Sequence, residues 1–210
     1  MNAQVQLNQE EMDAFKEVIN IGMGKAGAAL SEILEGFVSL KVPEVQLLEL
    51  DNLIHVLEKS VADFSSINMS KQSFVDQIRG EILFIFAPIA YERLGKILGF
   101  ENLQDLTANR KSELILEISN SLSSACLFGL SNQLGLSVAL KPPNMVCLEE
   151  APDKIKAKVF GGKKPSWDHT LLIKIEFSMS DIQFNCEILV FVAEDSILPL
   201  KNALNTLLED

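Results

Sequence analysis

Hydrophobic residues recur with a helical period over residues 9–34 and predict one long amphipathic helix. The apolar side chains that would form its buried stripe are Met12, Phe15, Ile19, Ala26, Leu30 and Ile33. Gly36 follows this segment and would end the helix. The chain therefore begins with a helix whose other side is free to carry polar groups.

Strand-like patterns come next. Runs of β-branched and aromatic residues predict strands at 39–50, around 55–64 and at 74–87. Residues 90–98 are predicted to form a short amphipathic helix, and residues 99–109 form a polar connector.

The second half of the chain repeats this order. Its predicted elements are a helix at 112–134, strands at 136–148, 154–160, 170–179 and 181–193, a loop or hairpin connection at 161–167, and a final helix at 195–208. The buried side of the long helix would comprise Ile115, Ile118, Leu122, Cys126, Gly129 and Leu130. Residues 187–191 also echo residues 81–85 in sequence.

This repetition predicts an α/β (α+β) fold built from a duplicated unit with a pseudo-two-fold axis. A continuous β-sheet would display two long helices, one from each half, on one face. Residues 1–210 would form a single domain, with halves at roughly 9–105 and 110–208.

A polar motif lies on each long helix, and the two copies are one hundred residues apart. The first copy is Asp13, Glu17, Asn20 and Pro43, and the second is Glu113, Glu117, Asn120 and Pro143. On a helical wheel, the first acid–amide trio points away from the apolar stripe. A solvated helix face commonly carries such residues, but the same spacing in both halves favours a displayed functional site.

Three glycines interrupt the first helix, and each should cost about 1 kcal/mol relative to alanine. Gly22 points toward the core, where close packing of the helix on the sheet would explain it. Gly24 and Gly27 lie beside the acid–amide trio, and we interpret them as a bare platform on which the backbone of a partner protein can rest.

The second helix has Leu127 and Phe128 where the first has Gly27 and Ala28. These bulkier side chains either pack on the partner and tune its recognition or hinder its approach. We therefore rank the first site above the second.

Composition restricts the possible partners. The chain has 210 residues, 48% hydrophobic and 22% charged, which is ample for a packed core. Its formal charge of −11 and its lack of a Lys/Arg cluster disfavour nucleic acid as a partner.

The N-terminus has no secretory signal pattern, and the longest apolar run, residues 82–91, is shorter than the roughly 20 residues of a membrane span. We expect no membrane insertion.

Cysteine and histidine usage points away from metal or disulfide chemistry. Cys126, Cys147 and Cys186 are odd in number and far apart, so they are predicted to be reduced thiols in the cytoplasm. His55 and His169 stand alone and are predicted to be polar surface or loop residues. We expect no metal site in this chain.

The spacing of Asp or Ser, Glu, Asn and Pro resembles the signature of the CheC/CheX/FliY family of chemotaxis phosphatases. The first copy matches it in full, whereas Glu113 replaces the Asp or Ser of the second copy. The run Asn20-Ile21-Gly22 is also similar to the family's first helix. The resemblance covers nearly the whole chain, and the presence of two sites makes it most similar to CheC.

This resemblance implies a CheC-like fold and an enzyme that hydrolyses the aspartyl phosphate of a phosphorylated CheY-type response regulator in two-component signalling. It assigns Glu17 and Glu117 to the regulator's active-site lysine, and Asn20 and Asn120 to orientation of the attacking water. The residue types suit these roles, since a carboxylate accepts from an ammonium and a neutral carboxamide positions water without repelling a phosphoryl group. No cofactor is expected in this chain, and Mg²⁺ is expected on the regulator.

A different class of function is the alternative. The chain could be a catalytically silent adaptor that binds a response regulator or the deamidase CheD. The Glu and Asn residues are intact at both sites. They favour the enzyme, because a pure adaptor has no need of the asparagine.

Overall fold

The computed structural model describes residues 7–62, 66–87, 91–100, 107–151, 159, 169–179 and 184–209. Its helices are α1 (Gln9–Ile33), α2 (Leu50–Val61), α3 (Tyr91–Ile97), α4 (Ala108–Leu134) and α6 (Ile197–Glu209), with a short 3₁₀ turn, η3 (Glu194–Ser196), before α6. Its strands are β1 (Val38–Glu49), β2 (Ile67–Asp76), β3 (Gly80–Phe86), β4 (Val138–Leu140), β5 (Asn144–Glu150), β6 (His169–Met179) and β7 (Phe184–Ala193).

All of these strands join one antiparallel sheet in the order β1-β6-β7-β3-β2-β4, and β5 also pairs with β2. The central pair, β3 and β7, takes one strand from each half of the chain. Each half also places a strand against the other half, because β1 pairs with β6 and β4 pairs with β2. Both edges of the sheet therefore have the same arrangement, in which a strand of one half pairs with a strand of the other half. The predicted α/β fold with one continuous sheet is confirmed.

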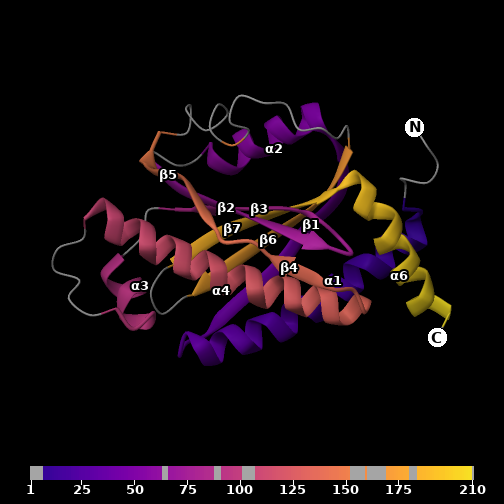
Figure 1. The fold of residues 1–210 in the computed structure, drawn as a ribbon, viewed down its shortest axis with the longest axis horizontal. Helices are drawn as coiled ribbons and strands as arrows, with labels where there is room; N and C mark the ends of the chain where they lie inside the picture. The colour runs from indigo at the N-terminus through magenta and orange to yellow at the C-terminus, as the bar shows by residue number, and fades with distance from the viewer. Residues whose placement is uncertain are drawn as a thin grey trace.

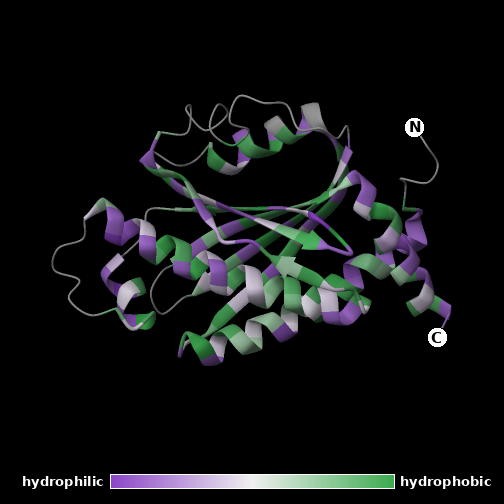
Figure 2. Ribbon diagram, in the orientation of Figure 1, coloured by the Kyte–Doolittle hydropathy of each residue, from purple (hydrophilic) through white to green (hydrophobic). Residues whose placement is uncertain are grey.

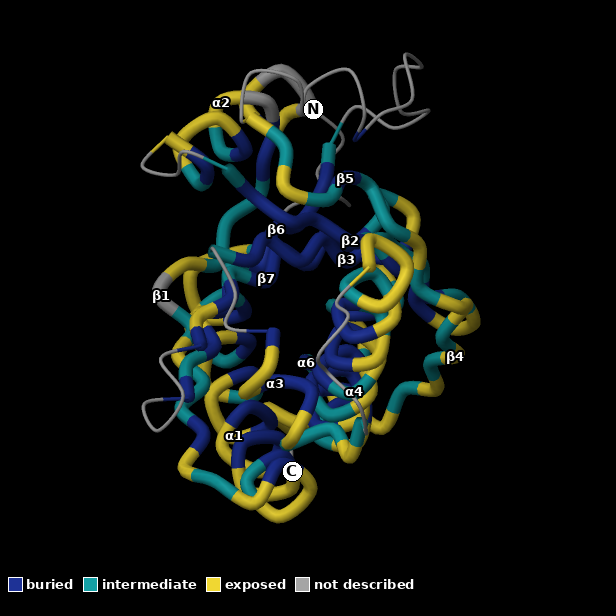
Figure 3. The backbone as a smooth tube through the Cα atoms, turned by 90° about the vertical axis from the view of Figure 1, so that its left-hand side faces the viewer, coloured by how far each residue is buried: buried dark blue, intermediate teal, exposed yellow. Residues whose placement is uncertain are grey.

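The helices lie in two layers on the sheet. The long helices α1 and α4 cover one face, and α2 covers the other (Figure 1). Hydrophobic residues follow the strands, whereas the helices mix hydrophobic and hydrophilic positions (Figure 2). The central strands are buried and both long helices expose their outer sides (Figure 3). Two long helix faces are thus available to solvent on the same side of the molecule.

A separate hydrophobic core fills each layer. The larger core joins the sheet to α1, α4 and α6 and includes Phe15, Ile19 and Leu122. The smaller core lies under α2 and includes Leu53 and Leu57. Each of these five side chains is at most 4% exposed. Burial of this apolar surface is the main stabilising term of the fold.

The long helices contact each other through two glycines. A Cβ atom on Gly129 would lie 2.4 Å from the carbonyl oxygen of Gly22, and one on Gly22 would lie 2.9 Å from the carbonyl oxygen of Gly129. Only hydrogen atoms fit between the two backbones. Gly22 therefore serves the packing of α1 on α4, and the predicted packing of this glycine on the sheet is wrong.

Three of the predicted strands differ from the structure. The segment around 55–64 is mostly α2, in which Leu53, Leu57 and Val61 recur every four residues and face the smaller core. The segment 74–87 contains the end of β2, a reversal at 77–79 and β3. The buried Ile78 made that reversal resemble a strand. The third is the strand predicted at 136–148, which in the structure is divided into β4 and β5 by two prolines.

The other predicted elements are present with small shifts at their ends. After α1 the positive φ belongs to Glu35, at 47°, rather than to Gly36. Ile33 is 60% exposed, so its predicted burial is wrong. The strand expected at 154–160 and the connection at 161–167 lie outside the described residues, except for residue 159, which is helical.

α4 is long and apolar enough to cross a membrane by those two criteria, with a mean hydropathy of 1.3 over an 18-residue window. However, 61% of that window is buried inside the protein. The apolar side chains of α4 belong to the larger core, as in the core helix of a globular protein.

Candidate functional site

Both acid–amide trios lie on the solvent side of their helices. Asp13, Glu17 and Asn20 are exposed on α1. The second trio, Glu113, Glu117 and Asn120, is likewise exposed on α4. The residues between the trio members, such as Phe15, Ile19, Leu114 and Ile118, are buried. Helical periodicity therefore places the polar motif outward in both halves, as the wheel predicts.

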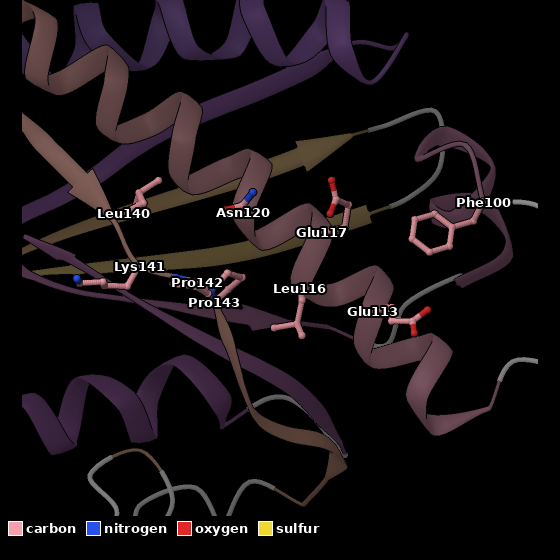
Figure 4. A pocket seen from close by; sticks show the side chains of 9 residues that line it. All are labelled: Phe100, Glu113, Leu116, Glu117, Asn120, Leu140, Lys141, Pro142 and Pro143. Atoms are coloured by element: carbon pink, nitrogen blue, oxygen red, sulfur yellow. The ribbon is translucent and has the colours of Figure 1, made fainter.

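The second trio borders an open cavity of about 660 Å³. The residues that line it come from α4, from the chain around β4 and from the segment after α3 (Figure 4). They are Phe100, Glu113, Leu116, Glu117, Asn120, Leu140, Lys141, Pro142 and Pro143. The four members of the second motif thus meet at one cavity, although Pro143 is distant from the others in sequence.

Asn120 is held by a glutamine of the sheet. Gln72, on β2, is 1% exposed, and its Nε2 donates to Asn120 Oδ1 at 3.1 Å. The same nitrogen donates to the carbonyl oxygen of Lys141 at 2.7 Å. Ser123 Oγ donates to Gln72 Oε1 at 2.6 Å. Gln72 therefore connects α4, β2 and the residue that precedes the two prolines.

More buried hydroxyl groups extend this network under α4. Ser119 Oγ lies 2.6 Å from Ser70 Oγ and donates to the carbonyl oxygen of Ile115 at 2.6 Å. Ser123 Oγ also lies 2.9 Å from the carbonyl oxygen of Ser119. Because a buried polar group without a partner is costly, these contacts are needed for the helix to rest on the sheet here.

The sheet register identifies the counterpart of Gln72 in the other half. Gln72 lies opposite Ile82 in β3, and Ile175 lies opposite Ile188 in β7. Ile82 and Ile188 occupy the same place in the repeated sequence, so Ile175 stands where Gln72 does. It is 2% exposed and belongs to the larger hydrophobic core.

The rest of the network is replaced in the same way. The polar residues Ser70, Ser119 and Ser123 correspond to Ile173, Ile19 and Met23, all of which are buried in the larger core. Among the residues that the structure describes, no side chain forms a hydrogen bond with Asn20. The two asparagines therefore lie over different surroundings, one polar and one apolar.

The acidic residues of the motif differ in their partners. Asp13 accepts from Gln9 Nε2 at 3.0 Å and lies 4.0 Å from Lys16 Nζ. Glu113 accepts from Arg110 at 3.1 Å. Glu17 and Glu117, by contrast, have no hydrogen bond or ion pair with any described residue. Their carboxylates are available to a cation from outside.

The predicted docking surface is smaller than expected. Gly24 is exposed and Phe128 is 69% exposed. Gly27, however, is buried and faces Leu40 of β1, and Leu127 is 4% exposed. The assignment of Gly27 and Leu127 to this surface is wrong, because both residues belong to the buried sides of their helices. Leu127 therefore cannot hinder a partner.

The two prolines of the motif occupy different settings. Pro143 lines the cavity beside Asn120 and follows Pro142 between β4 and β5. Pro43 lies within β1, where the pairing with β6 shifts register between Lys41 and Glu44. Proline lacks an N–H donor and suits such an irregularity.

The cysteines contribute no reactive group to either site. Cys126, Cys147 and Cys186 are buried and free. Burial raises the pKa of Cys126 to about 12 and raises that of Cys186 well above its ordinary value. Thiolate chemistry is therefore disfavoured at these two residues. Within the described ranges, no three His, Cys, Asp or Glu side chains gather as metal ligands.

Sequence reasoning did not find Gln72 or its partners. One signal was present, since Ser119 and Ser123 fall on the same helical arc as Ile115, Ile118 and Leu122. Serine on an apolar arc indicates a polar partner inside the protein. The identity of that partner depends on the tertiary fold.

No family model matches this chain. The CheY-P phosphatase CheC of Bacillus subtilis is 24% identical over 143 residues, which cover 66% of this chain and 67% of CheC.

Solved structures resemble it over most of its length. The Thermotoga maritima FliY structure has a TM-score of 0.67 and 18% identity, and the match covers 95% of this chain and 98% of FliY. FliM from the Helicobacter pylori FliM–SpeE complex has a TM-score of 0.60 and 12% identity, covering 96% and 97%. CheX of Vibrio vulnificus has a TM-score of 0.50 and 15% identity, covering 85% and 97%.

The resemblance to the CheC/CheX/FliY family is confirmed. At these low sequence identities, the structural matches show only that this chain and the solved proteins share a fold. The CheC/CheX/FliY fold thus holds both copies of the motif on its outer helices.

Proposed function

We propose that the chain is a phosphatase that hydrolyses the aspartyl phosphate of a phosphorylated CheY-type response regulator. One observation carries the proposal: Glu117 and Asn120 lie one helical turn apart at an open cavity, and a buried glutamine holds the asparagine. The similarity to CheC, whose name describes a CheY-P phosphatase, supports the choice of substrate.

Glu117 supplies the electrostatic contact in this mechanism. Its carboxylate is exposed and forms no ion pair with any described residue, so it can accept hydrogen bonds from the active-site lysine of the regulator. A helix places residues three apart on the same face, so Asn120 reaches the same active site when Glu117 contacts the lysine. Glu17 and Asn20 have the same relation on α1.

Asn120 orients the attacking water. The water oxygen attacks phosphorus as the bond between phosphorus and the aspartyl oxygen breaks, and the proton of the water passes to the phosphate product or to solvent. The products are inorganic phosphate and the free aspartate of the regulator. A neutral carboxamide suits this task because it adds no negative charge near the phosphoryl group, and the gain in rate comes chiefly from orientation.

The metal in this reaction belongs to the substrate protein. We propose that Mg²⁺ on the regulator stabilises the charge of the phosphoryl group, and that this chain adds only the carboxylate and the carboxamide. This division agrees with the chemistry of the site, in which Glu117 is the carboxylate without an ion pair and Glu113 is engaged by Arg110. A cytoplasmic location goes with such a substrate and stays a prediction.

An adaptor is the second candidate. Two of the FliM structures similar to this chain come from complexes, one with SpeE and one with FliG. The same fold therefore occurs in proteins that assemble with partners, and exposed Phe128 gives the helix layer an apolar contact. In this case the chain would bind the regulator, or CheD, without turnover.

Release of phosphate from an acetyl-phosphate-charged CheY-type regulator tests the proposal. We expect wild type to accelerate dephosphorylation, and the double variant Asn20→Ala/Asn120→Ala to lose at least about 10-fold of that acceleration. Lys59→Ala, on α2 at the opposite face of the sheet, is the matched control and should retain the full rate. If wild type binds the phosphorylated regulator but leaves its lifetime unchanged, the adaptor is the better description.

A further inference from the structure

We propose that Gln72 is a positioning residue that fixes the carboxamide of Asn120 and makes the second site the faster of the two. This inference rests on the phosphatase function proposed above. Glu117 and Asn120 are on α4, whereas Gln72 is on β2 and is 1% exposed, so it acts only through Asn120.

The hydrogen bonds determine which end of each amide points where. The carbonyl oxygen of Lys141 can only accept, so the Gln72 atom 2.7 Å from it is the nitrogen. Gln72 Oε1 then faces the hydroxyl of Ser123 at 2.6 Å. The Asn120 atom 3.1 Å from the same nitrogen must be an acceptor, which is Oδ1. A backbone carbonyl thus sets the orientation of Asn120 through one glutamine.

Lys141 is itself well fixed. Its N–H donates to the carbonyl oxygen of Ser73 at 2.9 Å. Pro142 follows it directly, and a residue before proline is restricted to extended conformations. The segment just before the motif proline Pro143 therefore holds the carbonyl group that orients Gln72, and so it helps to place Asn120.

A fixed carboxamide is valuable for orienting a water. Asn120 Oδ1 faces inward to Gln72, so the Nδ2 group and the second lone pair of Oδ1 are what the side chain can offer at the cavity. Rotation of the amide by half a turn would exchange its donors and its acceptor. Preventing that rotation keeps one hydrogen-bonding pattern at the place where the water binds.

The first site lacks this restraint. The counterpart of Gln72 is Ile175, which offers no hydrogen bond, and in the described part of the chain no other side chain bonds to Asn20. The amide of Asn20 is free to rotate until the regulator binds. The network therefore reverses the ranking suggested by the bulky residues on α4, and the second site becomes the preorganised one.

Gln72→Met removes both donors and the acceptor while keeping side-chain length. The variant should be assayed in the Asn20→Ala background, where only the second site acts. We expect kcat for dephosphorylation of the charged regulator to fall about 10-fold, with KM changed less than about twofold, because docking through Glu117 is untouched. A general loss of folding would instead lower the concentration of active sites and the thermal midpoint together.

A double-mutant cycle separates positioning from structural damage. If Gln72 acts through Asn120, Gln72→Met should cause no further loss of the first-site activity that remains in Asn120→Ala with Asn20 intact. An additive loss would overturn the proposal. Should Gln72→Met fail to fold, Ser123→Ala removes the donor to Gln72 Oε1 with a smaller change, and a kcat loss of about threefold is then expected. Unchanged kcat in that variant would also overturn it.

A second readout does not depend on turnover. The side-chain amide order parameters of Asn120 and Asn20 in the wild-type protein can be compared by NMR relaxation. We expect Asn120 to be ordered, with a value of about 0.8, and Asn20 to be mobile, below about 0.6. Equal mobility would refute the anchoring. If the anchoring is found but the protein releases no phosphate from the regulator, the proposed function has failed and the inference about geometry stands.

Discussion

The two sites share a glutamate and an asparagine on the outside and have different residues underneath. Asn120 lies over Gln72 and buried serines, whereas Asn20 lies over isoleucines and a methionine. An apolar underside stabilises the fold by burial, whereas a hydrogen-bonded underside fixes the orientation of the asparagine side chain above it. The comparison teaches that a repeated surface motif does not imply two equally prepared sites, because orientation comes from residues that the motif omits.

The helix N-termini differ as well. On α1, Asn8 and Glu11 form a capping box, and Glu11 also accepts from Lys201 of α6 at 3.0 Å. On α4, Lys111 takes the place of Glu11 and pairs with Glu149 at 2.6 Å. Each helix is thus attached to the protein by an ion pair, but the charge at this position is reversed between the halves.

The largest expected effect comes from making the apolar underside polar. Ile175→Gln would bury a carboxamide among isoleucines and a methionine, where it would find no serine partner. We expect the free energy of unfolding to fall by about 3 kcal/mol in urea titrations. The neighbouring Glu176→Gln, on an exposed position, should change it by less than about 0.5 kcal/mol. Equal stability of both variants would mean that the two undersides do not differ in the way described.

The next effect concerns the contact that both sites share. Gly129→Ala places a methyl group 2.4 Å from the carbonyl oxygen of Gly22, and backbone atoms cannot move aside as a side chain can. We expect a loss of about 2 kcal/mol in the free energy of unfolding, measured in urea. The contact between α1 and α4 is common to both sites, so the Asn20→Ala and Asn120→Ala backgrounds should lose phosphatase activity equally. A loss at only one site would contradict this shared role.

A pH-dependent effect is expected at the N-terminus of α1. Burial acts to raise the pKa of Glu11, but hydrogen bonds from the Asn8 backbone and from Lys201 outweigh it and lower the pKa below its ordinary 4.5. A carboxyl group with a lowered pKa contributes its full stabilisation at pH values above its unfolded-state pKa. This contribution is lost as the pH falls through its folded-state pKa. Glu11→Gln should therefore cost about 1 kcal/mol in urea at pH 7.

The difference between wild type and Glu11→Gln should narrow as the pH is lowered below about 4.5. Glu10→Gln, in the same first turn but exposed, is the control and should cost less than about 0.5 kcal/mol. A deficit of Glu11→Gln that persists unchanged at low pH would show that its carboxylate charge is irrelevant.

The smallest effect tests Gly24 as a docking position. An added Cβ meets no atom within 4 Å, so Gly24→Ala should stabilise the protein by about 0.5 kcal/mol through helix propensity. If a regulator rests on this glycine, the same methyl group should raise KM for the charged regulator at the first site. A stability gain with unchanged KM would remove Gly24 from the docking surface.

The sequence was sufficient for features that depend on local periodicity. The two long helices, most of their buried arcs and the outward motif follow from spacing along the chain. The α2 segment contains β-branched residues that suggest a strand, although Leu53, Leu57 and Val61 have the spacing of a helix. The turn between β2 and β3 was missed because 77–79 lacks the usual Gly/Asn pair of a hairpin and includes the buried Ile78.

The site could be predicted only in part, because some of the residues that meet there are far apart in sequence. The outward residues Glu117 and Asn120 are close in sequence, so their relation is fixed by the helix alone. Gln72 is 48 residues from Asn120, and the two meet only because β2 passes beneath α4. Likewise the burial of Gly27 and Leu127 depends on which neighbour each helix packs against.

The exchange of strands between the halves has a consequence for synthesis. β1 is made early, but its pairing partner β6 is more than one hundred residues further along the chain. At typical translation rates of 5–20 residues per second, β1 waits on the order of ten seconds for that partner. During this time the first half exposes an unpaired strand edge, and folding with such distant contacts is intrinsically slow. The nascent chain, rather than the finished protein, is where this fold is most open to aggregation and to chaperones.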